Sequence, residues 1–515
     1  MSAAHDAADL LVRSRNLFTG TGPTATHGHV AVSGATITAV GPGDGAEWCG
    51  PRTEVVDAGE GLVCAGLHDN HVFLTGTVPD HLAVDLAGTD DPAEAAARLV
   101  KAADSHPAPV PVLGSGWRGT GDALAAALGS APDGRTVVVW DADRALLWQN
   151  GTAARRYAIL PGPISNEALA PVFADAFTDA GLVREVYGTA QDELFRRGVV
   201  SVKDIAFDDY LGALPVLRQM RAEGTLRLRL AFASQPVRRP VDLEFGRRAS
   251  AECRDPLLQF HGFKLMTDGV WVDGTGHMLG GYPGLPGAGT ELPDYEALEE
   301  AARRVVEAGF ALGLNVDGDG AARWAVTVFE RLAAAGHPVG PRHSLSDLSF
   351  VDPADAARAG ALGLTFEVYP QFLGLFPSAE DCPAEALLGP AGRGLNRFAT
   401  MARSGVSLSS GTDLPLFWPS LPDAIRAATH RRFTDGSPPD GWCPEEALPA
   451  AEVVRAWTVG GARARGTAGR VGTLAPGLRA DLAVFSHDLL GASPDELTQV
   501  QVTATIAGGE VVHRA

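Results

Sequence analysis

The sequence predicts an α/β protein: a (β/α)8 TIM barrel, with a small β-sandwich built from both ends of the chain and a domain inserted after the first barrel strand. Three observations predict this architecture. Eight short apolar runs alternate with alanine-rich amphipathic stretches through the middle of the 515 residues, which is typical of parallel strands covered by helices. Both ends of the chain are rich in alternating β-branched residues. Roughly 125 residues separate the first apolar run from the second, far more than an ordinary connection needs.

The two ends of the chain are predicted to form one domain, over residues 1–60 and 465–515. Segments such as HGHVAVSGATITAVGPG near the start and GTLAPGLRADLAVFS near the end alternate apolar and polar residues and are broken by glycine and proline, as short strands are. Because chain termini often lie close together, we expect both sets of strands to share the β-sandwich.

The barrel is predicted over residues 61–74 and 191–464. Its eight candidate strands are residues 62–69, 198–204, 226–234, 260–268, 311–317, 342–348, 364–370 and 406–413. Several are followed by stretches such as DYEALEEAARRVVEAG, in which apolar residues recur at helical spacing. Eight strand–helix units are the number that closes a TIM barrel.

The long gap between the first two barrel strands predicts an inserted domain over residues 75–190. It carries the motifs GSGW, at 114–117, and WQN, at 148–150. We expect this domain to cap the barrel mouth and to contribute to substrate binding.

Composition limits the classes of partner. The net charge of −20 argues against nucleic acids and anionic membranes, because both would repel the protein. The sequence has no signal-peptide pattern near its start and no run of about 18 apolar residues, and its five cysteines form no CxxC pair. We therefore expect a cytoplasmic protein with reduced thiols, acting on a small-molecule substrate as a monomer or a homodimer.

Ionisable side chains stand at the carboxyl ends of most predicted barrel strands, where barrel enzymes carry their active sites. They are His68, Asp69, His71, Lys203, Asp204, Lys264, Asp268, Asp317, Asp319, Asp347, Glu367 and Asp413. One such residue is usually a helix cap or a partner for backbone groups. Their collection on separate strands predicts a functional cleft.

Several motifs resemble one family in order and spacing along nearly the whole chain. They are AGLHDNHVF, GSGW, WQN, GLVREVYG, FKLMTDG, DGDGAA, RHSLSDLSFVDPAD, SSGTDLPL and VGTLAPGLRADLAVF. With these motifs the chain resembles the amidohydrolase superfamily, and within it the YtcJ-like branch, amidohydrolase family 3. The resemblance implies a hydrolase with one or two divalent metals at the barrel mouth.

The resemblance also implies a set of metal ligands, from which this sequence departs. The implied ligands are two histidines on the first strand, a lysine, one histidine on each of two further strands, and an aspartate on the last. His71, Lys264 and Asp413 match this pattern. Phe73 replaces the second histidine, while Asn315 and Asp347 stand where the two later histidines are expected. The metal site is therefore predicted to be degenerate.

The remaining donors limit the metals that this site can hold. His71, Lys264 and Asp413 would be the ligands of a single divalent metal, and three protein ligands are enough for a catalytic Zn²⁺. Phe73 cannot bind a metal, and Asn315 offers only a carbonyl oxygen. We therefore expect either no metal or one, zinc being favoured, rather than a binuclear centre.

The resemblance and the aromatic residues near the strand ends also give candidate substrate-binding residues. They are Phe73, Trp117, Trp148, Asn150, Asn315, Tyr369 and Trp418. Aromatic residues at these places suit an apolar pocket for an organic substrate, and they are equally suited to packing in the barrel core.

Three functions remain open on the sequence. The first is a divergent amidohydrolase with at most one metal, which hydrolyses an amide or formamide bond in a small C–N-containing substrate. The second is a metal-independent cyclase, lyase or isomerase, of the kind found in specialised metabolism, in which Lys264, Asp413, Asp347 and His71 carry protons. The third is a binding protein without catalysis. The first two share the same four predicted catalytic residues.

Overall fold

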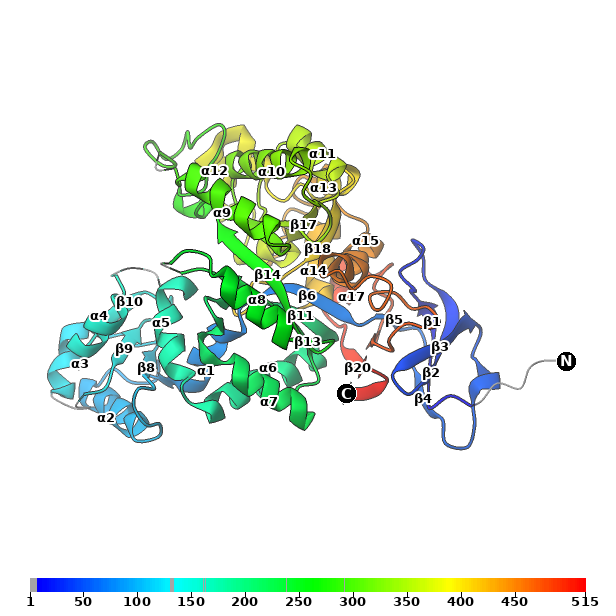
Figure 1. Ribbon diagram of the computed structural model, residues 1–515, viewed down its shortest axis with the longest axis horizontal. Helices are drawn as coiled ribbons and strands as arrows, with labels where there is room; N and C mark the ends of the chain where they lie inside the picture. The colour runs from blue at the N-terminus through cyan, green and yellow to red at the C-terminus, as the bar shows by residue number, and fades with distance from the viewer. Residues whose placement is uncertain (1–6, 130–133, 161, 163, 238, 291) are drawn as a thin grey trace.

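The computed structural model describes the chain except for residues 1–6, 130–133, 161, 163, 238 and 291. These positions, from the predicted segments 1–60, 75–190 and 191–464, lie outside the described residues. A barrel occupies the centre of the molecule, with the inserted segment at one end and a sheet from both termini at the other (Figure 1). None of the described helices is both long and apolar enough to cross a membrane.

Eight parallel strands form the barrel, as predicted. They are β6 (Leu67–Val72), β11 (Val199–Phe207), β12 (Arg229–Gln235), β14 (Leu258–Met266), β15 (Ala311–Asn315), β16 (Ser344–Ser346), β17 (Thr365–Val368) and β18 (Ser407–Ser410). Each strand pairs in parallel with the next one in this order. The first strand, β6, also meets the segment that follows the last strand, β18. There the backbone N–H of Asp413 donates to the carbonyl of His71 (2.8 Å), and that of Phe73 donates to the carbonyl of Leu414 (2.7 Å). The barrel is thus nearly closed.

Amphipathic helices surround the barrel. They are α6 (Ala180–Arg196), α7 (Leu214–Glu223), α8 (Leu243–Glu252), α9 (Tyr295–Glu307), α10 (Asp319–Ala334), α11 (Pro353–Ala361), α13 (Phe398–Arg403), α14 (Leu421–Thr429) and α15 (Ala450–Arg455). Their apolar faces and the strands form one continuous core. The strands are covered on both sides, which is why they read as continuous apolar runs.

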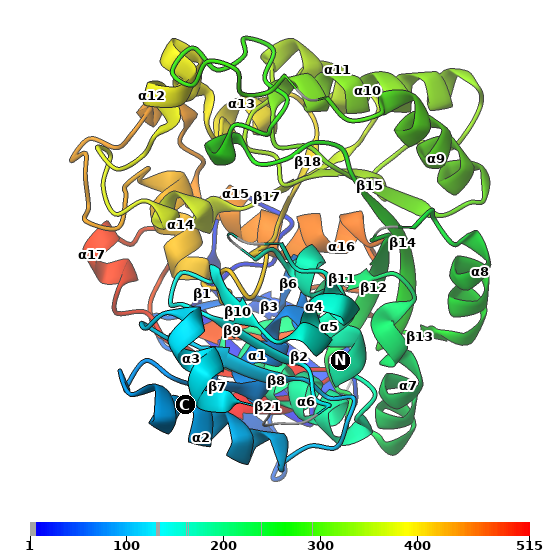
Figure 2. The ribbon, with the colours of Figure 1, turned by 90° about the vertical axis from the view of Figure 1, so that its left-hand side faces the viewer.

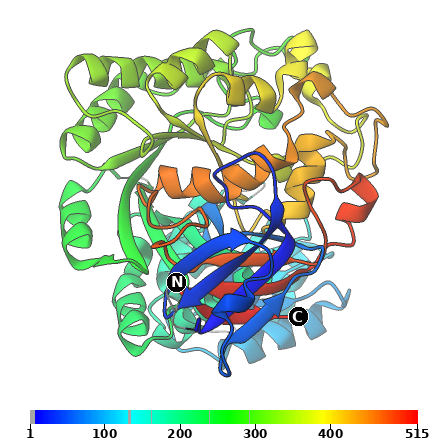
Figure 3. The same ribbon diagram turned by 90° about the vertical axis from the view of Figure 1, so that its right-hand side faces the viewer.

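Strands from both termini form a second sheet, visible as neighbouring blue and red arrows in Figure 3. Its strands are β1 (Leu10–Leu17), β2 (Thr26–Ser33), β3 (Thr36–Pro42), β4 (Glu54–Asp57), β5 (Leu62–Ala65), β19 (Leu482–Phe485), β20 (Val502–Ala507) and β21 (Glu510–Arg514). They form one hydrogen-bonded sheet of eight strands around a core of its own.

The first predicted barrel strand, residues 62–69, is divided between the two sheets. β5 pairs with β1 and β19 of the terminal sheet, and only β6 belongs to the barrel. Gly66 separates them, where a Cβ atom would come within 2.5 Å of the side chain of Val200. The prediction of one continuous strand was wrong because both halves are buried and apolar, so that the hydrophobic pattern does not change at the break.

The inserted segment has a sheet and helices of its own, which lie in front of the barrel in Figure 2. Its elements are α1 (Val78–Leu82), β7 (Ala83–Asp85), α2 (Pro92–Ala103), β8 (Val112–Ser115), α3 (Gly121–Leu128), β9 (Val137–Trp140), β10 (Leu146–Gln149), α4 (Gly151–Tyr157) and α5 (Asn166–Ala176). A separate cluster of buried side chains between this sheet and α2 and α3 forms its core. Helix α5 reaches the barrel mouth.

Candidate active site

A cavity of about 330 Å³ opens at the carboxyl ends of the barrel strands. Its polar lining includes Lys264, Asn315, Asp317, Asp347 and Asp413. Its apolar lining includes Phe73, Met266, Val270, Trp271, Val272, Phe372, Leu375, Phe376, Leu395 and Leu416. The polar residues come from different strands, because the carboxyl ends of parallel strands meet at one end of a barrel.

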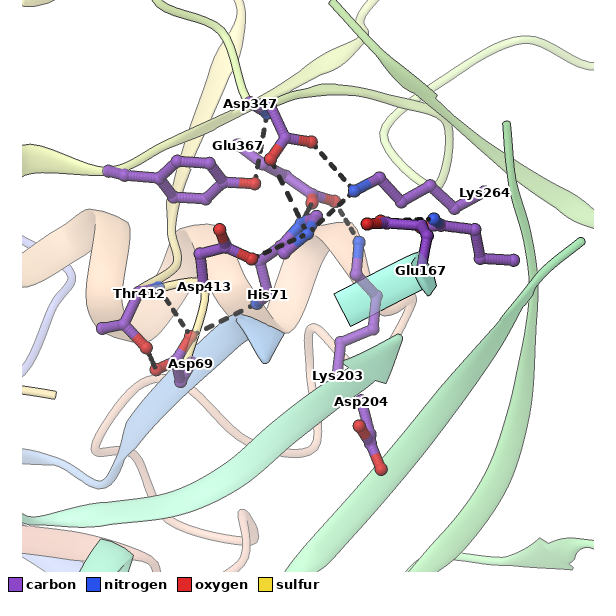
Figure 4. Close-up of polar contacts among 12 residues, drawn as sticks. Asp69, His71, Glu167, Lys203, Asp204, Lys264, Asp347, Glu367, Thr412 and Asp413 are labelled. Carbon is purple, nitrogen blue, oxygen red and sulfur yellow. Dashed lines mark hydrogen bonds and ion pairs between the residues drawn. The ribbon is translucent and has the colours of Figure 1, made fainter. Parts of the chain in front are cut away.

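His71, on β6, lies below this cavity and is fully buried. Its Nδ1 lies 3.2 Å from a carboxylate oxygen of Glu367, on β17, whose other oxygen forms an ion pair with Nζ of Lys203 on β11 (Figure 4). Burial alone would raise the pKa of Glu367, but the charge of Lys203 and the hydrogen bond with His71 outweigh it and lower that pKa. Glu367 is thus a carboxylate, which only accepts hydrogen bonds.

The ionised Glu367 determines where His71 carries its hydrogen. Burial, together with the charge of Lys264, lowers the pKa of His71, so its ring is neutral near pH 7. Nδ1 of His71 then donates to Glu367, and Nε2 keeps its lone pair. A histidine that ligates a metal is commonly oriented in this way by a carboxylate.

Three side chains surround Nε2 of His71. Nζ of Lys264, on β14, lies 3.1 Å from Nε2 and 3.0 Å from Oδ2 of Asp347. Carboxylate oxygens of Asp347 and Asp413 lie 3.9 and 4.0 Å from Nε2. Figure 4 shows these groups, which come from four strands, pointing toward one another.

Asp347 and Asp413 both follow a strand and both have left-handed backbone conformations, with φ of 59° and 54°. Aspartate adopts this conformation more readily than most residues, but it still carries backbone strain. Hydrogen bonds hold it in place: the N–H of Asp347 donates to the hydroxyl of Tyr369 (3.1 Å), and that of Asp413 to the carbonyl of His71. Such strain is commonly found where side chains are positioned for function.

The two aspartates differ in their proton affinity. Burial would raise the pKa of Asp347, but the charges of Lys264 and His71 outweigh it and the pKa is lowered. For Asp413, burial and the nearby charge of Asp347 raise the pKa well above its usual value. Two neighbouring carboxyl groups with pKa values shifted in opposite directions form a typical acid–base pair.

His71, Asp347 and Asp413 also form a candidate site for a cation. One potential ligand atom of each lies within 4.8 Å of the other two. An imidazole lone pair fixed by Glu367 and two carboxylates are donors that suit Zn²⁺ and related divalent cations. The residues present therefore fit one divalent cation. Lys264, whose Nζ faces the same lone pair, competes with a cation for it as long as it is an ammonium group.

Comparison with known proteins identifies the family. The sequence profile of the amidohydrolase family matches residues 54–513. The chain belongs to the amidohydrolase family. Within it, the chain is YtcJ-like: it is 24% identical over 263 residues to YtcJ of Bacillus subtilis (strain 168), a protein named as an amidohydrolase.

Further relatives of this amidohydrolase match over shorter stretches. The N-substituted formamide deformylase of Arthrobacter pascens is 31% identical over 110 residues, which are 21% of this chain and 20% of the relative. The YtcJ alignment covers 50% of this chain and 48% of YtcJ. The chain thus aligns with about half or less of these curated relatives.

Solved structures confirm the fold of this amidohydrolase. An uncharacterised metal-dependent hydrolase from Pyrococcus horikoshii OT3 superposes with a TM-score of 0.74 at 19% identity, covering 94% of this chain and 99% of that one. A zinc-bound adenosine deaminase from Xanthomonas campestris superposes with a TM-score of 0.56 at 16% identity, covering 98% of this chain and 93% of that one. Identities this low show the fold alone.

The structure brings the four predicted catalytic residues of this amidohydrolase together. Polar side-chain atoms of Lys264, Asp347 and Asp413 all lie within 4.0 Å of Nε2 of His71. Lys264 also contacts Asp347 directly. Asp347, which stands where the resemblance implies a histidine ligand but was not counted among the ligands of a single metal, joins the candidate ligand set. Lys264, predicted as a ligand, is in contact with two members of that set.

Three predicted substrate-binding residues lie at or near the cavity. Phe73 and Asn315 line it. The Phe73 ring lies 5.4 Å from Nζ of Lys264 and stacks on Phe207, so it occupies the place of a second histidine with an apolar surface. Tyr369 is buried beneath the residues that line the cavity, and its ring packs edge-on against His71.

The other four predicted substrate-binding residues lie away from the cavity. Trp117 is buried in the core of the insertion and Trp148 packs against that core. Asn150 caps helix α4 by accepting from the N–H of Ala153. Trp418 packs on the barrel core beneath Arg197. Their motifs serve the folding of the insertion and the packing of the barrel rather than the lining of this cavity.

Three further residues belong to the site: Glu367 and Lys203, which the sequence placed at strand ends without a role, and Glu167, which it did not single out. The chain has only three lysines, Lys101, Lys203 and Lys264, so a lysine within an apolar strand is a signal of function. Glu167, the second residue of α5, lines the cavity from the insertion and accepts a hydrogen bond from Gln235 (3.1 Å). Nothing in its sequence context distinguishes it from an ordinary residue in the first turn of a helix.

Proposed function

We propose that this amidohydrolase hydrolyses the C–N bond of a small, N-substituted amide or formamide, with one divalent cation held by His71, Asp347 and Asp413. The observation that carries this proposal is the convergence of Nε2 of His71 and two carboxylates at the floor of the cavity, with ligand atoms within 4.8 Å of one another.

The cavity supports a substrate with one polar and one apolar part. Its floor is polar, whereas its rim carries exposed apolar side chains, among them Val270, Leu375 and Leu416. The side-chain amide of Asn315 lines the cavity and has no hydrogen-bond partner among the described residues, so it is free to contact a carbonyl or amide group. A volume of about 330 Å³ suits a small organic molecule. The similarity to an N-substituted formamide deformylase is consistent with this class.

Hydrolysis adds water across the C–N bond and releases an acid and an amine. A divalent cation bound here would polarise the substrate carbonyl and make water more acidic. Asp413 lines the cavity beside the proposed cation, and as a carboxylate it would accept the proton of the attacking water and return it to the leaving nitrogen. Glu367 and Lys203 keep Nε2 of His71 available as a ligand.

A second candidate is a metal-independent acid–base reaction, such as a cyclisation, elimination or isomerisation. It is favoured by the direct contacts of Lys264 with Nε2 of His71 and with Asp347. In that arrangement the ionised Asp347 is the base and the protonated Asp413 is the acid. None of these reactions consumes water, and a cyclisation or isomerisation also releases no amine.

The experiment that tests the first candidate measures amine release from a panel of N-substituted amides and formamides. The protein is tested as purified, after treatment with a chelator, and after reloading with Zn²⁺, Mn²⁺ or Fe²⁺. We expect amine release that chelation removes and one of these metals restores, and that Asp347→Asn abolishes. Asp273→Asn, which changes an exposed aspartate outside the cavity lining, is the matched control and should keep full activity.

Two results would contradict the first candidate. Amine release that persists unchanged after complete metal removal would contradict the role of the cation. Conversion of a substrate to an isomer or a cyclised product without amine release would favour the second candidate.

A further inference from the structure

A second cavity, of about 170 Å³, lies at the opposite end of the barrel from the candidate active site. Four arginines line it, Arg229, Arg465, Arg470 and Arg479, together with Ser201 and Gln259. We call it the arginine cavity.

The arginine cavity lies where three parts of the fold meet. Ser201, Arg229 and Gln259 stand near the amino ends of β11, β12 and β14. Arg465 ends the short helix α16 (Gly461–Ala464). Arg479 belongs to the segment that leads into β19 of the terminal sheet, which lies on this side of the barrel (Figure 1).

Among the described residues, only Arg229 of these four arginines forms an ion pair with a carboxylate. Arg229 forms two hydrogen bonds with Asp481, at 2.6 and 2.8 Å. Within the described part of the chain, Arg465, Arg470 and Arg479 form no ion pair. The neighbouring carboxylate Asp255 is held by Arg221, at 2.7 and 2.8 Å.

Two of these arginines also have unused hydrogen-bond donors. Arg465 is 7% exposed and donates to the hydroxyl of Ser201, but its Nε is buried and has no partner among the described residues. Nε of Arg479 is likewise buried and without a partner there. A buried guanidinium without a counter-charge is costly, because both its charge and its N–H groups lose water.

His68 is a buried histidine close to these arginines. It is fully buried on β6, and neither ring nitrogen has a hydrogen-bond partner among the described residues. Burial and the charges of Arg465 and Arg229 lower the pKa of His68, so its ring stays neutral and supplies no further positive charge. The excess of positive charge at the cavity therefore resides on the arginines, in a chain whose net charge is −20.

We propose that the arginine cavity binds a small oxyanion: a phosphate group or a carboxylate, free or at the end of a small metabolite. Guanidinium groups present planar pairs of N–H donors that match the oxygens of both groups. A bound oxyanion would lie against Arg465 and Arg479, whose neighbouring carboxylates Asp481 and Asp255 form their ion pairs with other arginines. The exposed Arg470 would contact it from the solvent side. Because these residues and their neighbours come from the barrel and from the segment before β19, the bound anion joins the barrel to the terminal sheet.

Isothermal titration calorimetry of the full-length protein tests this proposal. The protein is titrated with inorganic phosphate and, separately, with citrate, and a titration with chloride at the same ionic strength is the reference. We expect saturable binding of at least one of the two anions, with about one anion per chain, and a rise in melting temperature on binding. Arg479→Gln and Arg470→Gln should each weaken the binding at least about tenfold. These two are less buried than Arg465, so their replacement keeps the folded protein available for measurement.

The control is Arg52→Gln, which removes one exposed arginine of the terminal segment that has no ion pair among the described residues. It should bind the anion as the unchanged protein does. Binding of phosphate but not citrate identifies a phosphate group as the ligand, and the reverse result identifies a carboxylate. No saturable binding of either anion would overturn the proposal, as would equal affinities in Arg479→Gln and Arg52→Gln.

Discussion

At the scale of single residues, the chemistry of the site depends on which nitrogen of His71 carries the hydrogen. The buried pair of Lys203 and Glu367 keeps Glu367 ionised, and Glu367 in turn accepts from Nδ1 of His71. This arrangement keeps the lone pair of Nε2 toward Lys264, Asp347 and Asp413. The proposed binding of a cation therefore depends on Glu367 and Lys203, which do not line the cavity.

Replacement of Glu367 by glutamine tests this dependence. Glu367→Gln removes the charge that orients His71 and leaves Lys203 without its counter-ion. Loss of a residue that orients a metal ligand typically lowers metal affinity about 10- to 100-fold. We therefore expect a fall of this size in Zn²⁺ affinity, measured by competition with a chromogenic chelator. An unchanged affinity in folded Glu367→Gln would show that His71 does not need this partner.

Lys264 is required by the metal-independent reaction, through its contacts with His71 and Asp347. We expect Lys264→Met to lower kcat/KM by about 10²- to 10⁴-fold, the usual contribution of a positioned acid or base, while circular dichroism stays unchanged. Lys101→Met removes an exposed lysine on α2 and should have no effect. Undiminished turnover in Lys264→Met would rule out the metal-independent reaction as described.

The raised pKa of Asp413 predicts how metal binding depends on pH. Burial and the charge of Asp347 keep a proton on Asp413 in the cation-free protein, and a bound cation must displace that proton. Metal affinity should therefore increase with pH and decrease as the pH falls below the pKa of Asp413. Zn²⁺ dissociation constants measured across a pH series check this, and a constant affinity from about pH 5 to about pH 9 would contradict it.

At the scale of secondary-structure elements, the seam between β6 and β18 carries a buried hydrogen-bonded carboxylate. Asp69, on β6, accepts from the hydroxyl of Thr412 (2.6 Å) and from the N–H groups of Thr412 and His71 (3.2 Å each). Burial raises the pKa of Asp69 to about 7 in spite of these donors. This seam holds His71 and Asp413 in register with each other.

Thr412→Val removes one donor and leaves an oxygen of Asp69 buried without its partner. We expect a loss of about 1–3 kcal/mol in the free energy of unfolding, measured by chemical denaturation. The loss should be larger at about pH 8, where Asp69 is ionised, than at about pH 5, where it is protonated. Thr26→Val, which changes an exposed threonine on β2, should cost little. A similar loss of stability in both variants would show that the hydrogen bond between Thr412 and Asp69 does not stabilise the fold more than an exposed threonine does.

Hydrophobic patterning predicted the barrel strands well and the ends of elements less well. All eight predicted apolar runs overlap a barrel strand, because strands buried on both faces consist of continuous apolar residues. The division at Gly66 was missed, because the chain passes from one buried sheet to another without a polar residue. Trp117, Trp148 and Asn150 were assigned to substrate binding although they pack and cap the insertion, since a motif does not show which core its side chains join.

At the scale of the whole molecule, the insertion and the terminal sheet lie at opposite ends of the barrel (Figure 1). The insertion places Glu167 at the mouth of the candidate active site. The segment before the terminal sheet places Arg470 and Arg479 at the arginine cavity. Neither contribution follows from sequence spacing, because each depends on how a separate part of the chain docks on the barrel. The four residues around Nε2 of His71 could be predicted, because the carboxyl ends of the strands of a TIM barrel meet at one end of the barrel.

The central claim is that His71, Asp347 and Asp413 together hold one divalent cation. Elemental analysis of the protein purified without chelators, beside Asp347→Asn and Asp273→Asn prepared in the same way, tests it most directly. The account predicts about one equivalent of Zn, Mn or Fe per chain in the unchanged protein and in Asp273→Asn, in keeping with a three-ligand catalytic site, and a much lower content in Asp347→Asn. A metal-free protein that also fails to take up these metals would contradict it, as would equal metal contents in the two variants.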